Sequence, residues 1–157
     1  MTARKVGRIY HQKQIEIVRC KAEITRLTKL VDSHKQSTFS NKKRMMKQLK
    51  FFLSTRNALY KEIEHYQFLI HMIELGIHVV KEYATAKNFN RFYQNNFENK
   101  RQLDIALDED VSEVTIARAV SSLNKVFMNY IRQDLESYLQ GDKAYLKMLK
   151  AWQQELN

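Results

Sequence analysis

Residues 45–80, MMKQLKFFLSTRNALYKEIEHYQFLIHMIELGIHVV, carry the pattern that decides the fold. Apolar side chains recur in steps of four and three residues, the spacing of a helix seam that packs against other helices. The seam positions are Met45, Leu49, Phe52, Arg56, Leu59, Ile63, Tyr66, Ile70, Ile73, Ile77 and Val80. Ten of these eleven positions are apolar, and the spacing predicts one long helix over residues 42–84. Arg56 either fixes the register by meeting an acidic group or extends to water.

A second amphipathic helix is predicted ahead of the seam, over residues 8–33. Its apolar positions fall on spacings of three, four and seven residues: Tyr10, Ile17, Cys20, Ile24, Leu27 and Val31. The polar segment 33–41 predicts the loop between the two helices, with Ser40 or Asn41 as the cap of the second. Because the first helix is the shorter one, the rest of the seam must pack on the C-terminal part of the chain or on a second subunit.

The composition supports an all-α fold. The chain of 157 residues contains no Pro and only three Gly, so it has few residues that break helices. Cys20 is the only cysteine, which excludes an intramolecular disulfide and favours a reducing compartment. No apolar run approaches the length of a bilayer span, so we expect a cytoplasmic protein without a membrane partner.

Residues 97–131, FENKRQLDIALDEDVSEVTIARAVSSLNKVFMNYI, predict a helix-turn-helix. Asn99 is the expected cap of its first helix, with Gln102 at the third helical position. This helix is expected to bury Leu103, Leu107 and either Ile105 or Ala106, and a turn over Asp108–Asp110 follows. Val111 then packs inward and Ser112 caps the second helix. The expected inner face of the second helix is Ile116, Val120 and Leu123.

The second helix of this motif is expected to run on to about Leu139, and Gly141 is expected to separate it from a last short helix. Two domains are therefore predicted. Residues 1–86 form a basic hairpin of long helices that serves oligomerisation, and residues 87–157 form the helix-turn-helix domain with its long tail helix.

The segment FYQNNFENKRQLDIALDEDVSEVTIARAVSSLNKVFMNYI resembles the C-terminal part of phage late-gene transcriptional activators of the RinA and ArpU type. It resembles region four of sigma factors more distantly. The shared pattern comprises the aromatic residues Phe92, Tyr93 and Phe97, the basic pair Lys100 and Arg101, and the core Val111, Ser112, Thr115, Ile116 and Arg118. The resemblance implies a sequence-specific regulator of phage operons that acts on host RNA polymerase in the bacterial cytoplasm.

Positive charge is concentrated in the first part of the chain. Residues 1–60 contain 15 Lys and Arg against 3 acidic residues, a net charge of +12. Such a field attracts a polyanion, and nucleic acid is the expected one. Residues 98–132 carry five basic and six acidic side chains instead. Either the N-terminal region supplies affinity while the helix-turn-helix supplies selectivity, or the helix-turn-helix binds protein.

The docking geometry of a helix-turn-helix assigns roles to individual side chains. The residues expected to face base edges are Glu113, Val114, Ala117, Arg118 and Ser121. The residues expected to contact phosphate are Lys100, Arg101, Ser112, Thr115, Lys125, Lys42, Lys43, Arg44 and Lys47. The alternative for Arg118 is a surface salt bridge to Glu113 or Asp110. Double-stranded DNA is the expected partner, and a homodimer is favoured because such regulators commonly read two half-sites.

Chemistry of other kinds has little support in the sequence. Three scattered Gly cannot build a phosphate loop, and Glu62-x-x-His65 is only half of a di-iron motif. We therefore expect no catalytic residues, no metal and no cofactor. Two alternatives to the DNA-binding regulator stay open: a helical adaptor that binds RNA polymerase or another protein, and a small packaging-terminase subunit.

Overall fold

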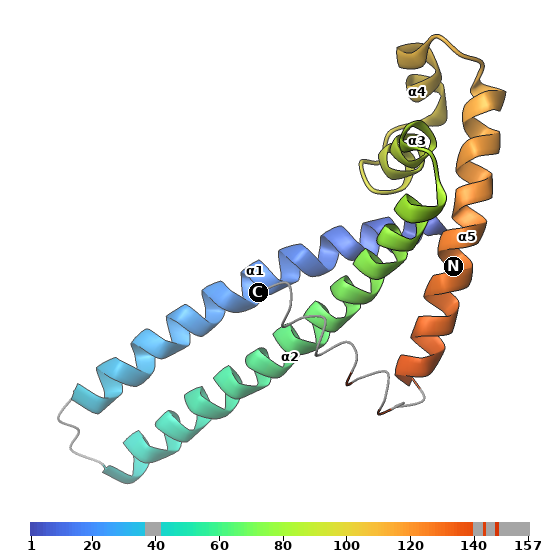
Figure 1. Cartoon of the computed structure of the whole chain (residues 1–157). Helices are drawn as coiled ribbons and strands as arrows, with labels where there is room; N and C mark the ends of the chain where they lie inside the picture. The colour runs from blue at the N-terminus through green and yellow to red at the C-terminus, as the bar shows by residue number, and fades with distance from the viewer. Residues whose placement is uncertain (37–41, 140–142, 144–146, 148–157) are drawn as a thin grey trace. The chain divides into compact units, whose positions relative to one another are not determined.

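The computed structural model describes residues 1–36, 42–139, 143 and 147 of the chain (Figure 1). Its five helices are α1 (Ala3–Gln36), α2 (Lys42–Tyr83), α3 (Ala86–Asn96), α4 (Gln102–Glu109) and α5 (Glu113–Leu139). These described residues contain no strand, and the all-α prediction is confirmed. None of their helices has the length and apolar character that crossing a membrane requires. The predicted cap at Ser40 or Asn41 and the helix after Gly141 lie outside the described residues.

The chain forms two compact units. We call residues 13–67 the hairpin unit, and residues 1–12 together with 68–157 the five-helix unit. This division differs from the predicted boundary after residue 86. Both long helices contribute to both units, because the first turns of α1 and the last turns of α2 pack with α3 and α5.

In the hairpin unit, α1 and α2 run antiparallel. The His34 ring lies 3.1 Å from Gln48 Oε1, Arg56 Nη1 donates to Thr28 Oγ1 at 3.3 Å, and Cys20 Sγ donates to Glu62 Oε2 at 3.8 Å. Residue numbers therefore rise along one helix as they fall along the other. The buried side chains of this unit are the predicted ones: Ile17, Cys20, Ile24, Leu27, Val31 and Ile63.

Two details of the hairpin unit differ from the sequence prediction. The first helix is longer than residues 8–33 at both ends, and it continues through Ser33 to Gln36. Arg56 forms no ion pair with a described acid, and its Nη1 donates to the hydroxyl of Thr28 instead.

Three phenylalanines form the centre of the five-helix unit. The ring centroids of Phe92 and Phe127 lie 5.5 Å apart, those of Phe97 and Phe127 5.8 Å, and those of Phe92 and Phe97 6.0 Å. Each of the three is at most 2% exposed. Buried side chains from α1, α2 and α5 complete this core: Ala3, Val6, Ile73, Val80, Leu123, Met128 and Ile131.

The later part of the long seam is therefore covered within the chain. Ile73 and Val80 of α2 belong to the same buried cluster as Phe127 of α5. Gly76 lies between them, and a Cβ atom there would come within 2.9 Å of Phe127 Cε2 and Ile131 Cδ1. Glycine at this position allows α5 to approach α2 closely.

Gly7 brings the start of α1 against the end of α3. A Cβ atom at this position would lie 2.0 Å from the carbonyl oxygen of Asn96. Because that atom belongs to the backbone, a side chain at residue 7 could be accommodated only by moving one helix. His11 adds a contact one turn later, with its Nε2 2.5 Å from the carbonyl oxygen of Phe97.

Replacing Gly7 by Ala should destabilise the protein by up to about 2 kcal/mol, because overpacking usually costs about 1–3 kcal/mol and the helix preference of alanine offsets part of it. Alanine raises intrinsic helix stability by about 1 kcal/mol over glycine, so the steric effect opposes the local preference. Urea unfolding followed by circular dichroism measures the difference. Lys21→Ala, at an exposed position of the same helix, is the control and should stay within about 0.5 kcal/mol. A stabilised Gly7→Ala variant would show that α1 does not touch α3.

Cys20 provides a test of the hairpin unit. Its side chain is 8% exposed, and burial, followed by the nearby Glu62 carboxylate, raises the pKa of the thiol. Because the thiolate is the reactive form, iodoacetamide at pH 8 should modify the native protein on the order of tenfold or more slowly than the unfolded protein. The Glu62→Gln variant removes the negative charge and should react faster than wild type. Equal rates with and without guanidinium would contradict the packing described here.

Candidate nucleic-acid interface

The loop from α3 to α4 is held by side-chain amides. Asn95 Nδ2 donates to the carbonyl oxygen of Lys100 at 2.9 Å, and Asn96 Nδ2 donates to Asn124 Oδ1 of α5 at 2.7 Å. Both asparagines are buried. These bonds fix the start of α4 relative to α3 and α5 within the five-helix unit.

The predicted cap of α4 is wrong. The helix begins at Gln102, its N-cap residue is Arg101, and no side chain makes a capping hydrogen bond. Asn99 instead has φ 57°, in the left-handed region that asparagine tolerates better than most residues. Its Oδ1 accepts hydrogen bonds from Arg4 Nε at 3.1 Å and Arg4 Nη2 at 2.7 Å. Asn99 therefore ties the first turn of α1 to this loop.

The buried face of α4 is narrower than predicted. Ile105 is fully buried and Ala106 is 3% exposed, whereas Leu103 is 46% and Leu107 71% exposed. Residues 103 and 107 are one turn apart and lie about 160° around the helix from residue 105. A helix of eight residues has one buried face, so burial of Ile105 directs both leucines outward.

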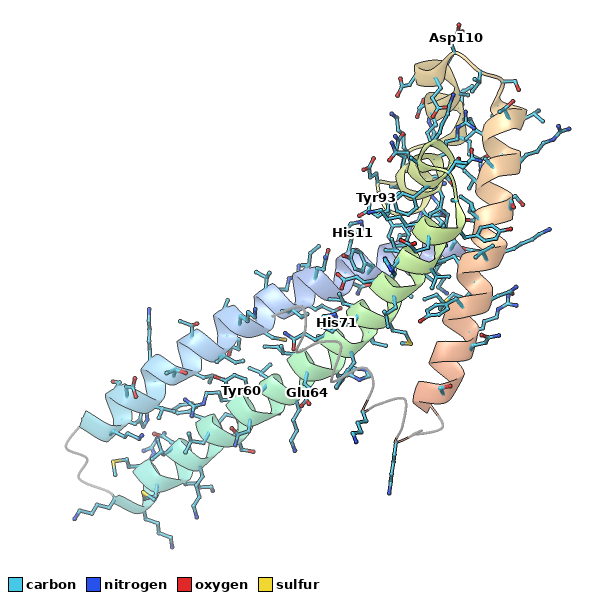
Figure 2. All side chains as sticks on the ribbon, in the orientation of Figure 1. His11, Tyr60, Glu64, His71, Tyr93 and Asp110 are labelled. Atoms are coloured by element: carbon cyan, nitrogen blue, oxygen red, sulfur yellow. The ribbon has the colours of Figure 1, made fainter. Side chains whose placement is uncertain are left out.

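The turn between the two helices is built on Asp110, which Figure 2 labels between α4 and α5. Asp110 adopts φ 53° and ψ 48°, and its N–H donates toward the carbonyl oxygens of Ala106 and Leu107. Val111 N donates to Ala106 O at 3.0 Å, which completes a Schellman motif. Val111 packs on the small core, as predicted. The turn begins later than predicted, because Asp108 and Glu109 belong to α4.

Ser112 caps the start of α5, as predicted. Its Oγ accepts from the N–H of Thr115 at 3.3 Å, and the two hydroxyls lie 2.9 Å apart. The inner face of the helix is also confirmed, since Ile116, Val120 and Leu123 are at most 4% exposed. Together with Ile105, Ala106 and Val111, the first two of these form a core of their own.

Of the five residues predicted to read bases, Val114, Arg118 and Ser121 lie opposite the inner face of α5, and Glu113 and Ala117 lie beside it. Glu113, Val114, Arg118 and Ser121 are exposed, and Ala117 is partly buried. Among the described residues Arg118 forms no ion pair, and neither Glu113 nor Asp110 meets it. This face of α5 is therefore exposed to solvent over the first three turns of the helix.

Lys100 and Arg101, predicted to contact phosphate, already have acidic partners. Lys100 Nζ pairs with Asp108, and Arg101 Nε lies 2.9 Å from Asp104 Oδ2. The hydrogen bond with Asp108 raises the pKa of Lys100, and the hydrogen bond with Asp104 raises that of Arg101. The same contact lowers the pKa of Asp104. Glu109 in turn pairs with Arg91. Asp104, Asp108 and Glu109 therefore each have a basic partner.

The other phosphate candidates fall into two groups. Ser112 and Thr115 are exposed at the start of α5 and Lys125 is exposed two turns beyond Arg118. Lys42, Lys43, Arg44 and Lys47 belong to the first turns of α2 in the hairpin unit. Lys42, Lys43 and Lys47 line a shallow groove there with Met46 and Lys50.

Arg91 was not predicted to have a role. Its side chain is 7% exposed, its Nε donates to Glu109 Oε2 at 2.7 Å, and its Nη1 donates to Asn88 Oδ1 at 3.1 Å. This ion pair joins α3 to the last turn of α4. Glu109 stands in the acidic run before the turn, but spacing alone does not identify a partner eighteen residues away.

Metal-binding geometry is absent from the described part of the chain, where no three His, Cys, Asp or Glu side chains gather around one point. Glu62, which belongs to the half di-iron motif of the sequence, accepts a hydrogen bond from the Cys20 thiol instead. No family model, curated protein or solved structure matches this chain.

The conformation of Asp110 leads to a test of the turn. A β-branched side chain in the left-handed region costs about 1–2 kcal/mol, so Asp110→Val should destabilise the protein by that amount, whereas Asp110→Gly should not. Thermal unfolding of both variants measures the difference, and Asp110→Asn controls for the lost charge. If the glycine variant loses as much stability as the valine variant, the backbone conformation is not what selects aspartate.

Proposed function

We propose that this protein is a sequence-specific DNA-binding transcriptional regulator of the phage type, which reads double-stranded DNA with the first three turns of α5. One observation carries the proposal. The α4–α5 motif buries its inner face in a core of its own and leaves Glu113, Val114, Arg118 and Ser121 exposed on the outer face. A helix held in this way can enter a major groove without disturbing the core behind it.

The exposed side chains suit base edges. The unpaired guanidinium of Arg118 has the geometry for two hydrogen bonds to guanine, and the Glu113 carboxylate can accept from the amino group of cytosine. Val114 and Ala117 offer methyl groups to thymine. We assign phosphate contact to Ser112 and Thr115, whose hydroxyls lie at the helix start.

Self-association belongs to the proposal, because two copies would read two half-sites. The seam of α2 contributes to the core of its own chain, so it is not the surface we assign to this contact. The hairpin unit offers other apolar side chains. The large hydrophobic residues exposed there are Ile15, Val18, Met46, Phe51 and Tyr60.

A second candidate, a helical adaptor that binds RNA polymerase or another protein, is favoured by the outer face of α4. Leu103 and Leu107 are 46% and 71% exposed and stand one turn apart, and Val114 at the start of α5 is 57% exposed. Exposed apolar residues grouped on one element are typical of protein interfaces. The two candidates differ in whether the purified protein binds DNA.

Selection of bound duplexes from a random DNA pool at about 150 mM salt tests the proposed function, since purely electrostatic binding is weakened there. We expect one enriched motif. Arg118→Ala should cost about 1–3 kcal/mol and relax the preference at one position of that motif. Arg19→Ala, an exposed arginine of the hairpin unit, is the matched control and should leave the motif unchanged.

Two outcomes would contradict the proposal. A pool without enrichment, and with little DNA retained, would favour the adaptor. An enriched motif that Arg118→Ala leaves intact at every position would show that another surface reads the bases.

A further inference from the structure

A groove lies where the first turn of α1 meets the middle of α5, within the five-helix unit. Its lining residues are Thr2, Ala3, Ser121, Asn124, Lys125, Met128, Asn129 and Arg132. A second groove along the first turns of α1 shares Thr2 with it and is lined by Thr2, Arg4, Lys5, Arg8, Ile9 and Gln12. The two grooves meet at Thr2, and we call the pair the α1–α5 groove.

The charged side chains that line the α1–α5 groove are all basic. Five basic residues line it, namely Arg4, Lys5, Arg8, Lys125 and Arg132, and no acidic residue does. Arg4 donates to Asn99. The other four are exposed and pair with no described acid. Thr2, Ser121 and Asn129 add neutral hydrogen-bonding groups between these charges.

The groove follows the reading face of α5. Arg118, Lys125 and Arg132 are seven residues apart, so they share one side of the helix and stand about 10 Å apart along its axis. The major groove of DNA is about 12 Å wide. With Arg118 at the base edges, Arg132 lies about 21 Å farther along the helix, beyond the groove and at the level of a phosphate backbone.

We infer that the α1–α5 groove binds the phosphodiester backbone of the duplex whose bases the start of α5 reads. Lys5, Arg8, Lys125 and Arg132 contact the phosphates. This inference rests on the proposed function and adds the first turns of α1 to the DNA interface. The basic hairpin domain that the sequence predicts over residues 1–86 is thus split. Its first twelve residues belong with the reading helix.

The test compares two double variants, Lys5→Gln with Arg8→Gln and Lys125→Gln with Arg132→Gln. Binding to the selected duplex and to an unrelated duplex is measured between 50 and 200 mM salt, which spans roughly the range where counterion release dominates. Each double variant should weaken binding to both duplexes by the same factor and lower the slope of log Kd against log salt by about 1.8, or about 0.9 for each lost contact. The selected motif should stay the same.

Two controls separate charge from folding. Lys21→Gln with Lys29→Gln removes two exposed charges from the hairpin unit and should leave the slope unchanged. Lys5→Arg with Lys125→Arg keeps the charge of the groove and should retain the wild-type slope. Since all four residues are exposed, we expect the variants to unfold at the wild-type temperature.

The outcomes distinguish this inference from the function on which it rests. An unchanged slope in both double variants, with the motif still selected, overturns the groove and leaves the proposed function standing. A change in the motif itself, with the slope unaffected, also overturns it, because these residues would then read bases. Wild-type protein that selects no motif overturns the function and the inference together.

Discussion

The contact of Phe92, Phe97 and Phe127 is the constraint on which the five-helix unit depends. The three rings come from α3, the residue after it and α5, and their centroids lie 5.5–6.0 Å apart. Ala3 and Val6 of α1 and Ile73 and Val80 of α2 belong to the same cluster. One apolar core thus fixes the position of α5, and through it the small α4–α5 core that exposes Arg118. Separation of the rings would release α5 and the start of α1 at once.

The scarcity of glycine and proline shapes how the chain turns. Without Pro and with three Gly, the chain must make its turns with other residues. It places Asn99 and Asp110 in the left-handed conformation, where each residue adds hydrogen bonds that stabilise it. Gly7 and Gly76 are then used inside helices, where close approach of a second helix requires the absence of a side chain.

The sequence predicted the features whose signals are local. The buried face of α1, the cap at Ser112 and the inner face of α5 follow from local signals, and the structure has them. The seam of α2 is confirmed in part: Ile63, Ile70, Ile73 and Val80 are buried, but so are Phe68 and Met72, which lie off the predicted seam. Asn99 was misassigned because a polar residue before a helix resembles a cap, whereas its partner Arg4 lies 95 residues away. Leu103 and Leu107 were misassigned because an eight-residue helix is too short for spacing to select its buried face. The role of residues 1–12 in the five-helix unit rests on packing of distant segments, which no local pattern contains.

The same contacts account for the charge of the helix-turn-helix, which carries more acidic than basic residues. On the side of α3 and α4, Asp104, Asp108 and Glu109 form ion pairs with Arg101, Lys100 and Arg91 in that order. Between residues 113 and 133 of α5, Glu113 is the one acid, and the basic residues are Arg118, Lys125 and Arg132. Net charge along the sequence therefore misrepresents the charge that a polyanion would meet. Ion pairing therefore places the three acids of α4 against Arg91, Lys100 and Arg101, whereas Arg118, Lys125 and Arg132 of α5 pair with no described acid.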